Sequence, residues 1–220
     1  MKTDDFFVIT INRELGSGGR TVGEQLAKRL EVPFYDKVLI QQLKKKYGLN
    51  TDEIERLKGQ KHNWWAEFKR SIRMMPNYVA PKIVPDYSSM PDFLITDDIF
   101  KAETEILKGI AADGSCVIAG RSGFFIFRDY PNHLSILIQA SMKHRIERVM
   151  QKQNISAEEA KAIIEEVDEG RENYVRKYTG SSRYDTRNYD LVINADNHSE
   201  DEIVEMIIHY MKLPLSKIIF

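Results

Sequence analysis

A cluster of glycines lies between the first apolar run of the chain and the first helical pattern, and its spacing suits phosphate binding. The run Phe6–Ile11 is apolar or β-branched throughout, which predicts a strand covered on both faces. The segment Asn12-Arg-Glu-Leu-Gly-Ser-Gly-Gly-Arg-Thr21 follows, and Val22, Leu26 and Leu30 then predict a helix. A glycine turn at such a junction leaves backbone N–H groups open to an anion, and the helix N-terminus adds about half a positive charge. The alternative is a turn that only packs the helix on the strand.

This segment departs from the usual phosphate-loop pattern, G-x-x-x-x-G-K-[ST], because it contains no lysine. If Thr21 ends the pattern, the two positions before it are Gly19 and Arg20. If Gly18 is the second glycine of the pattern, Gly19 stands at the lysine position and Arg13 at the first-glycine position. Arg13 or Arg20 could supply the missing charge, although a guanidinium is bulkier than an ammonium group and planar. Thr21 would offer a hydroxyl ligand to magnesium if a nucleoside triphosphate binds.

Arginines are frequent from position 121 onward, and their forked guanidinium groups match the geometry of phosphate. Arg121 follows the buried-type run Ser115–Gly120, and ligands of open α/β sheets bind at the carboxyl ends of strands. We expect Arg121 to hold a phosphate; the alternative is an ion pair with a neighbouring acid such as Asp129. Arg145 and Arg148 are three residues apart on a predicted helix and share a face, which is often only a solvated face.

Four further arginines lie on a long helical pattern or in the polar run after it. They are Arg171, Arg176, Arg183 and Arg187. The polar run, residues 178–187, could close over a ligand. We expect at least one of the four to reach phosphate and the others to be surface charges.

The elements that must position these residues alternate between strand and helix. Strands are predicted at Phe6–Ile11, Val32–Tyr35, Ser115–Ala119, Leu134–Gln139 and Tyr189–Asn194. Helices are predicted at Asp97–Ala112, at Met142–Gln153 and after capping boxes that begin at Ser156 and Ser199. This alternation predicts a parallel sheet with right-handed crossovers. Gly170 is unfavourable inside a helix and suggests a bend or a close contact there.

Residues 38–96 interrupt the alternation and carry four of the seven prolines, so they are predicted to form an insertion beside the sheet. The pair Trp64-Trp65 is expected to pack this insertion on the body rather than to stack on a base. Asp36 ends the second strand just before it. Its carboxylate could orient a substrate hydroxyl or a magnesium-bound water, or it could cap the helix that starts near Val38.

The composition narrows the classes of function. The chain has 32 basic and 33 acidic residues, so general nucleic-acid binding is not expected. No apolar stretch approaches the length that spans a bilayer, and the N-terminus is unlike a signal peptide, so the chain is expected to be cytoplasmic. The single cysteine, Cys116, is expected to be buried and inert, and the five histidines show no metal-ligand spacing. The apolar tail Leu213–Phe220 could bury against the body or against a second copy in a homodimer.

Several of these segments, in this order, make the chain resemble the cytidylate kinase-like family of the nucleoside monophosphate kinase group. They are the first strand with its glycine loop, Pro33-Phe-Tyr-Asp36, Val117-Ile-Ala-Gly-Arg-Ser122, Arg145-x-x-x-Val149 and Tyr189-Asp-Leu-Val-Ile-Asn194. The resemblance implies a three-layer α/β P-loop kinase fold with a five-stranded parallel sheet in one domain, residues 1–220. Its core would comprise 1–39, 96–150 and 188–212, with a helical monophosphate-binding insertion at about 40–95 and an arginine-bearing lid at about 150–188.

The resemblance also implies roles for the residues above. ATP would be bound by Gly16, Ser17, Gly18, Gly19, Arg20 and Thr21, with Mg²⁺ at Thr21. The acceptor nucleotide would be bound by Asp36, Arg121, Ser122 and Arg183. The charge of the transferred group would be neutralised by Arg13, Arg20, Arg145, Arg171 and Arg176. Two departures matter: Gly19 replaces the lysine on which catalysis depends, and Ser122 replaces an aspartate associated with cytosine nucleotides.

Three functions are therefore carried forward. The first is an ATP-dependent kinase of a nucleoside monophosphate such as cytidylate. The second is a catalytically weak nucleotide-binding or regulatory protein that kept the fold and lost the lysine. The third is a kinase of a small non-nucleotide acceptor, for which the unusual insertion leaves room.

Overall fold

The computed structural model describes residues 1, 4–36 and 97–213, without the side chains of residues 98 and 99. Five strands form one sheet in the order β2-β3-β1-β4-β5, and each neighbouring pair is parallel. The strands are β1 (Val8–Arg13), β2 (Phe34–Tyr35), β3 (Cys116–Ala119), β4 (His133–Gln139) and β5 (Leu191–Asn194). The predicted α/β fold with a five-stranded parallel sheet is confirmed.

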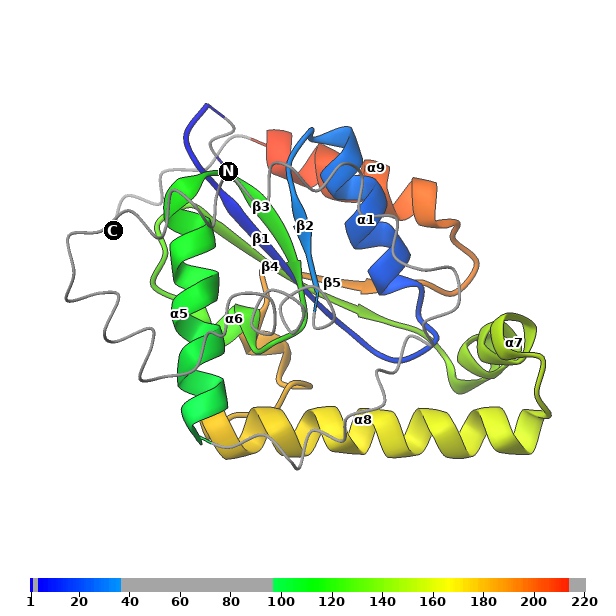
Figure 1. The fold of residues 1–220 in the computed structure, drawn as a ribbon. Coiled ribbons are helices and arrows are strands. Elements are labelled where there is room, and N and C mark those ends of the chain that lie inside the picture. Colours follow the sequence, from blue (N-terminus) through cyan, green and yellow to red (C-terminus); the bar gives the residue numbers. More distant parts are fainter. Residues whose placement is uncertain (2–3, 37–96, 214–220) are drawn as a thin grey trace.

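Helices cover both faces of this sheet (Figure 1). They are α1 (Gly19–Arg29), α5 (Asp97–Asp113), α6 (Gly123–Ile126), α7 (Met142–Gln153), α8 (Ala157–Thr179) and α9 (Glu200–Lys212), with a 3₁₀ turn η2 (Thr186–Asn188) before β5. Both predicted capping boxes are present: the hydroxyl of Ser156 accepts the N–H of Glu159, and that of Ser199 accepts the N–H of Glu202. These caps fix where α8 and α9 begin.

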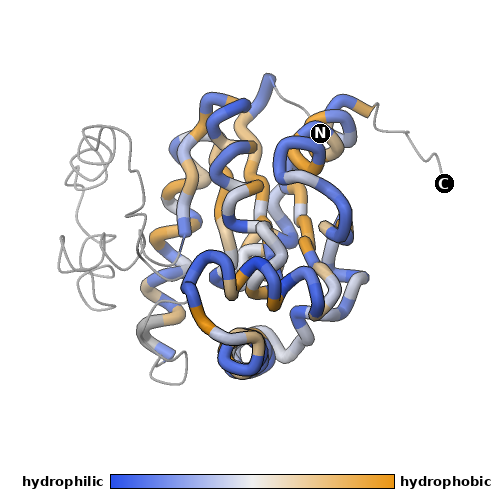
Figure 2. Tube along the Cα trace, turned by 90° about the vertical axis from the view of Figure 1, so that its right-hand side faces the viewer, coloured by the Kyte–Doolittle hydropathy of each residue, from blue (hydrophilic) through white to orange (hydrophobic). Residues whose placement is uncertain are grey.

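The core consists of two apolar layers, one on each face of the sheet. On one face, α1 and α9 pack Leu26 and Ile207 against strand residues such as Ile9 and Ile136. On the other face, α5 packs against β1 and β3. Figure 2 shows the strands as largely hydrophobic and the outward sides of the helices as hydrophilic. Cys116 lies in the second layer, where burial raises the pKa of its thiol to about 12, as expected for an inert cysteine.

Helix α8 runs past the carboxyl end of β1 (Figure 1), and its residues Asp168 and Arg171 bind the backbone of Leu15 and Arg13. One end of α8 packs Ile164 against Leu15 of the glycine segment, and the other end packs Tyr174 and Val175 against Phe124 of α6. Residues 150–188, predicted as a lid, therefore contact the glycine segment near one end of α8 and α6 near the other. The predicted insertion at about 40–95 lies outside the described residues.

Several sequence predictions differ from the structure in detail, as β2 and β5 each begin two residues later than predicted. The first strand begins at Val8 and runs to Arg13, so the first glycine-loop residues are still part of the sheet. Gly170 marks no close contact: α8 continues through it, and no atom of the described residues lies within 4 Å of the place of a Cβ. That part of the prediction was wrong. No helix within the described residues is long and apolar enough to cross a membrane.

Candidate active site

The glycine loop joins β1 to α1 and leaves the helix N-terminus without a side-chain cap. Gly18 is the N-cap residue in a left-handed conformation, and as a glycine it has no side chain with which to cap the first turn. The N–H groups at the start of an α-helix have no partner within the helix, so those that follow Gly18 are open to an external acceptor. An oxyanion fits this place, because the helix dipole adds positive potential to these donors.

Gly16 lets the loop pass directly beneath α7. Its φ of +84° is left-handed, and a Cβ there would stand 2.7 Å from the backbone oxygen of Arg145. Any side chain would meet both strain and backbone that has no room to give. Ser17 closes the turn, since its N–H and its hydroxyl both donate to the carbonyl of Glu14. The turn at Ser17 is therefore closed by hydrogen bonds to the loop's own backbone.

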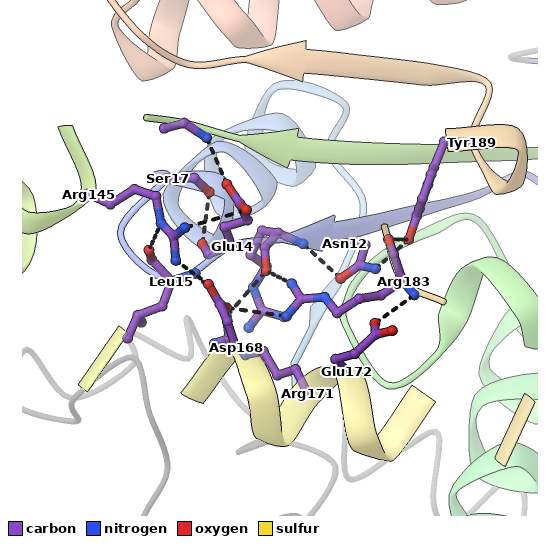
Figure 3. Close-up of polar contacts among 12 residues, drawn as sticks. Asn12, Glu14, Leu15, Ser17, Arg145, Asp168, Arg171, Glu172, Arg183 and Tyr189 are labelled. Atoms are coloured by element: carbon purple, nitrogen blue, oxygen red, sulfur yellow. Dashed lines mark hydrogen bonds and ion pairs between the residues drawn. The ribbon is translucent and has the colours of Figure 1, made fainter. Parts of the chain in front are cut away.

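A buried carboxylate on α8 holds the loop from behind. Asp168 accepts the N–H of Leu15 at 3.1 Å and pairs with three arginines (Figure 3). These are Arg145, Arg171 and Arg183, and we call Asp168 with these three the Asp168 cluster. Asp168 is only 7% exposed, so the cluster lies almost out of contact with water.

The arginines of the Asp168 cluster also bind backbone carbonyls of the loop. Arg145 donates to the carbonyl of Leu15 at 2.7 Å, and both Arg171 and Arg183 donate to the carbonyl of Arg13. These three arginines were predicted to bind phosphate or substrate. In the structure they bind the loop that would bind phosphate, and Arg183, expected as a surface charge or ligand group, is completely buried.

Glu14 and Tyr189 complete this support. The carboxylate of Glu14 accepts the N–H of Ala140, which follows β4, and lies 3.4 Å from Arg145. Tyr189 donates to the carbonyl of Arg183, and burial raises the pKa of its phenol to about 12. Neither residue was singled out from the sequence. An acid right after a strand is a weak signal, and its partners are distant in the chain.

The side chain of Arg13 lies between the start of α1 and the end of β3. A Cβ at Gly19 would stand 2.6 Å from the Cβ of Arg13, and a Cβ at Gly120 would stand 2.5 Å from its Nη1. Arg13 is 8% exposed. Its guanidinium thus lies at the junction of the two strand ends at which the loop and Arg121 were predicted to act.

Arg20 points away from this junction, toward the end of β2. Its guanidinium is bound by Asp36, with Nε and Nη2 at 2.9 and 2.8 Å from Oδ2, and Nη2 lies 3.1 Å from Glu24. Asp36 is buried at the place where a substrate hydroxyl was expected. Its contact with Arg20 is a third arrangement, one that the sequence did not suggest.

The end of β3 turns through three successive left-handed residues. The φ angles are +79° at Gly120, +57° at Arg121 and +53° at Ser122. Left-handed conformations of residues with a side chain cost free energy and are often found at functional sites. The hydroxyl of Ser122 is buried and has no hydrogen-bond partner among the described residues.

Arg121 is held in a buried ion pair with Glu103 of α5, and its guanidinium lies 4.9 Å from the centre of the Tyr174 ring. The acid that pairs with it is therefore Glu103. Asp129, which the sequence suggested as a neighbour, pairs with Arg128 on the surface. The pair joins α5 to the left-handed turn and the cation–π contact joins the turn to α8, so Arg121 anchors this end of the sheet.

Arg148 lies at the mouth of the loop and was not among the predicted site residues. It donates to the hydroxyl of Thr21 at 3.3 Å and pairs with Glu200, and both side chains lie beside Gly18. Its spacing of three from Arg145 was the one signal for it.

The contact of Arg148 with Thr21 also bears on magnesium binding. With a guanidinium on the Thr21 hydroxyl and another on the Asp36 carboxylate, neither oxygen suits a divalent cation in this arrangement. Within the part of the chain that the structure describes, no cluster of acids, histidines or cysteines could hold a metal ion.

The two remaining predicted arginines pair locally. Arg176 is largely exposed and binds Glu172 one helical turn away, and Arg187 binds Asp185. Such exposed pairs contribute little to stability.

Known proteins resemble this chain over most of its length. Residues 8–197 match the model of the cytidylate kinase-like family. A cytidylate kinase of Sulfurisphaera tokodaii is 24% identical over 214 residues, covering 96% of this chain and 98% of the relative. A cytidylate kinase of Pyrococcus horikoshii is 24% identical over 205 residues, covering 92% and 87%.

Solved structures agree on the fold. An uncharacterized protein from Eubacterium ventriosum has a TM-score of 0.69 at 23% identity, covering 94% of this chain and 99% of that one. A shikimate kinase from Bacteroides thetaiotaomicron has a TM-score of 0.50 at 14% identity, covering 94% and 99%. Identities this low show shared architecture alone. The solved structures show that this chain has the P-loop kinase fold. The match over residues 8–197 shows that it belongs to the cytidylate kinase-like family.

Proposed function

We propose that this protein is an ATP-dependent kinase of a nucleoside monophosphate, with cytidylate as the first acceptor to test. The observation that carries the proposal is the uncapped N-terminus of α1 behind a glycine loop that the Asp168 cluster holds open. A loop that only packed a helix on a strand would need neither the uncapped N-terminus nor three arginines behind it, two of them buried. The family and the cytidylate kinases among its relatives support the same reaction.

In this reaction an ionised oxygen of the acceptor phosphate attacks the terminal phosphorus of ATP. A new P–O bond forms while the bond to the bridging oxygen breaks, and its electrons leave with ADP. The protein has to hold both phosphates and balance the charge spread over the transferred group. The N–H groups after Gly18 would bind the donor phosphates, and the hydroxyl of Ser122 would find its partner in the acceptor.

Arg121 supports the acceptor side through the backbone. Its guanidinium is engaged by Glu103 and Tyr174, so a direct contact with phosphate would require its side chain to leave a buried ion pair. We assign it the role of fixing the left-handed turn that carries Ser122. Magnesium, which kinases of this kind use, would arrive on the nucleotide, since Mg²⁺ keeps water and phosphate oxygens as its usual ligands.

The test is an ADP-release assay with Mg·ATP over cytidylate, deoxycytidylate, the other monophosphates and small hydroxyl acceptors. We expect turnover that requires a monophosphate. Gly16→Ala should lower kcat/KM at least 100-fold, because a side chain there collides with the backbone of α7. Gly114→Ala is the matched control and should stay within twofold, since no atom of the described residues lies within 4 Å of its Cβ position.

No turnover with any acceptor at high enzyme concentration would refute the kinase. Gly19 at the lysine position favours the alternative of a nucleotide-binding protein with little activity. That alternative predicts thermal stabilisation by ATP without ADP release, since binding raises stability by RT ln(1 + [L]/Kd). Turnover restricted to a non-nucleotide acceptor would refute the nucleoside monophosphate as acceptor and would still support phosphoryl transfer from ATP.

A further inference from the structure

The cation and the glycine of the phosphate-loop pattern have exchanged places in this chain. The pattern has glycine at its first position and lysine at the start of the helix. If Gly18 is the second glycine of the pattern, Arg13, the last residue of β1, stands at the first position, and Gly19, the first residue of α1, stands at the lysine position. The two positions are six residues apart in sequence, and the structure brings them into contact.

The contact makes side chains at the two positions mutually exclusive. A Cβ at position 19 would lie 2.6 Å from the Cβ and 3.3 Å from the Cγ of Arg13. The third neighbour, the Cβ of Ile138 at 3.3 Å, is held in the sheet and cannot give way easily. The stem of Arg13 thus occupies the space through which a lysine at position 19 would begin. A side chain added at Gly19 alone would crowd the site. Loss of the Arg13 side chain alone would leave the site without its charge.

The far end of Arg13 reaches the carboxyl end of β3. Its Nη1 packs against Gly120 at the end of β3, whereas its backbone carbonyl is held by Arg171 and Arg183. The backbone is therefore fixed from one side while the guanidinium extends along the other, from the first turn of α1 to the left-handed turn. A phosphate bound to the N–H groups of α1 would lie next to this guanidinium.

Arg20, the other arginine considered for this role, is placed differently. Two carboxylates, those of Asp36 and Glu24, bind its guanidinium on the side toward β2. Moving it to the loop would leave buried Asp36 without this cation, which is costly.

We propose that Arg13 is the catalytic cation of this protein and takes the place of the phosphate-loop lysine, reaching the transferred phosphoryl group from β1 instead of from α1. The proposal rests on the kinase function proposed above. The guanidinium fork would bind two oxygens of the group in transit, a geometry that a single ammonium does not offer.

A positional swap tests the proposal. Arg13→Gly should lower kcat 100-fold or more, and Gly19→Lys alone should lower both activity and Tm because the added stem collides with Arg13. The double variant Arg13→Gly/Gly19→Lys restores the usual pattern, and its kcat should be at least tenfold higher than that of Arg13→Gly. Arg29→Gln is the control: it removes an exposed arginine at the far end of α1, the helix that begins at Gly19, and should leave kcat within twofold. Melting temperatures of all variants show whether each is folded.

The outcomes separate the two proposals. If the wild type is active and folded Arg13→Gly keeps at least half of its kcat, Arg13 is not the cation and the kinase function stands. If the swap fails to recover activity while both variants are folded, the exchange of positions is refuted. If the wild type binds ATP without turnover, kinase function fails, and the same variants are compared by Kd. A tenfold weaker Kd in Arg13→Gly, restored in the double variant, supports the charge exchange, and an unchanged Kd overturns it.

Discussion

Asp168 carries the negative charge that holds the glycine loop in place. Its two oxygens bind one backbone N–H and three guanidinium groups, and two of those guanidiniums reach the carbonyl of Arg13 as well. The loop is thus tied to α8 through charge rather than through apolar contact alone. Because the residues are buried, each tie depends on the others.

We predict that Asp168→Asn lowers the free energy of unfolding by about 3 kcal/mol, because three buried or half-buried guanidiniums lose their shared carboxylate. Urea denaturation monitored by circular dichroism measures the change. Glu165→Gln on the same helix is the control: its exposed pair with Lys161 should be worth no more than about 0.5 kcal/mol. Equal losses in the two variants would show that the cluster contributes no more than a surface pair.

Individual arginines were the hardest part of the site to predict from sequence. The sequence predicted that Arg145, Arg171 and Arg183 bind the ligand, and the structure shows them bound to the loop and to Asp168. Arginine binds backbone carbonyls and phosphates with the same donors, so residue type does not distinguish the two. The deciding partner, Asp168, shares a helix face with Arg171 but is far from Arg145 in sequence. The packing of α7 against α8 is what brings Arg145 to Asp168, and the sequence carries no local signal for that contact.

Elements were predicted better than contacts because their signals are local. The capping boxes at Ser156 and Ser199 place the starts of α8 and α9 correctly, and continuous apolar runs identify all five strands. Strand ends were less certain, since an apolar pattern marks burial and not hydrogen bonding. Thus β1 gains Asn12 and Arg13 from its pairing with β4.

Gly170 lies inside α8 although glycine is unfavourable in a helix, and no contact with the described residues explains its presence. Outside the backbone of α8, no atom of the described residues lies within 4 Å of its Cβ position, so alanine meets no clash from them. We predict that Gly170→Ala stabilises the protein by about 1 kcal/mol, because alanine loses less backbone entropy in a helix. Differential scanning calorimetry should show a rise in Tm of about 2–4 °C for a chain of this size.

Gly180 provides the matched comparison, since it ends the same helix with a φ of +68°. Gly180→Ala should lower Tm, because alanine disfavours the left-handed conformation. A fall in Tm for Gly170→Ala would mean that α8 needs its glycine for a motion or a bend that packing does not reveal.

At the scale of the whole molecule, the parallel sheet separates charge from apolar core. All five strands end at the same edge, where the glycine loop, Arg13 and the left-handed turn meet. The opposite end of the sheet carries no such cluster of arginines among the described residues, but it holds the half-buried His133 at the start of β4. The ring nitrogen Nε2 lies 2.7 Å from the hydroxyl of Thr10, and Val8 is its partner across the sheet.

His133 makes the stability of the whole fold sensitive to acid. Burial lowers its pKa from 6.5 to about 4, and the charge of Asp190 and the backbone of Phe127 offset this only in part. In the unfolded chain the imidazole takes up a proton near pH 6.5, whereas in the folded chain it stays neutral down to about pH 4. The unfolded state thus binds more protons in this interval, so the free energy of unfolding falls as the pH falls.

We predict a loss of up to about 3 kcal/mol from this residue between pH 6.5 and pH 4. His133→Gln keeps a side chain able to hydrogen-bond Thr10 but cannot be protonated, so its unfolding free energy should depend less steeply on pH over this range. Urea titrations at half-unit pH steps measure both slopes. His209→Gln, which removes an exposed histidine of α9, should keep the wild-type slope. Parallel slopes for wild type and His133→Gln would mean that His133 is protonated in the folded protein, and that the amino edge of the sheet admits more water than its packing indicates.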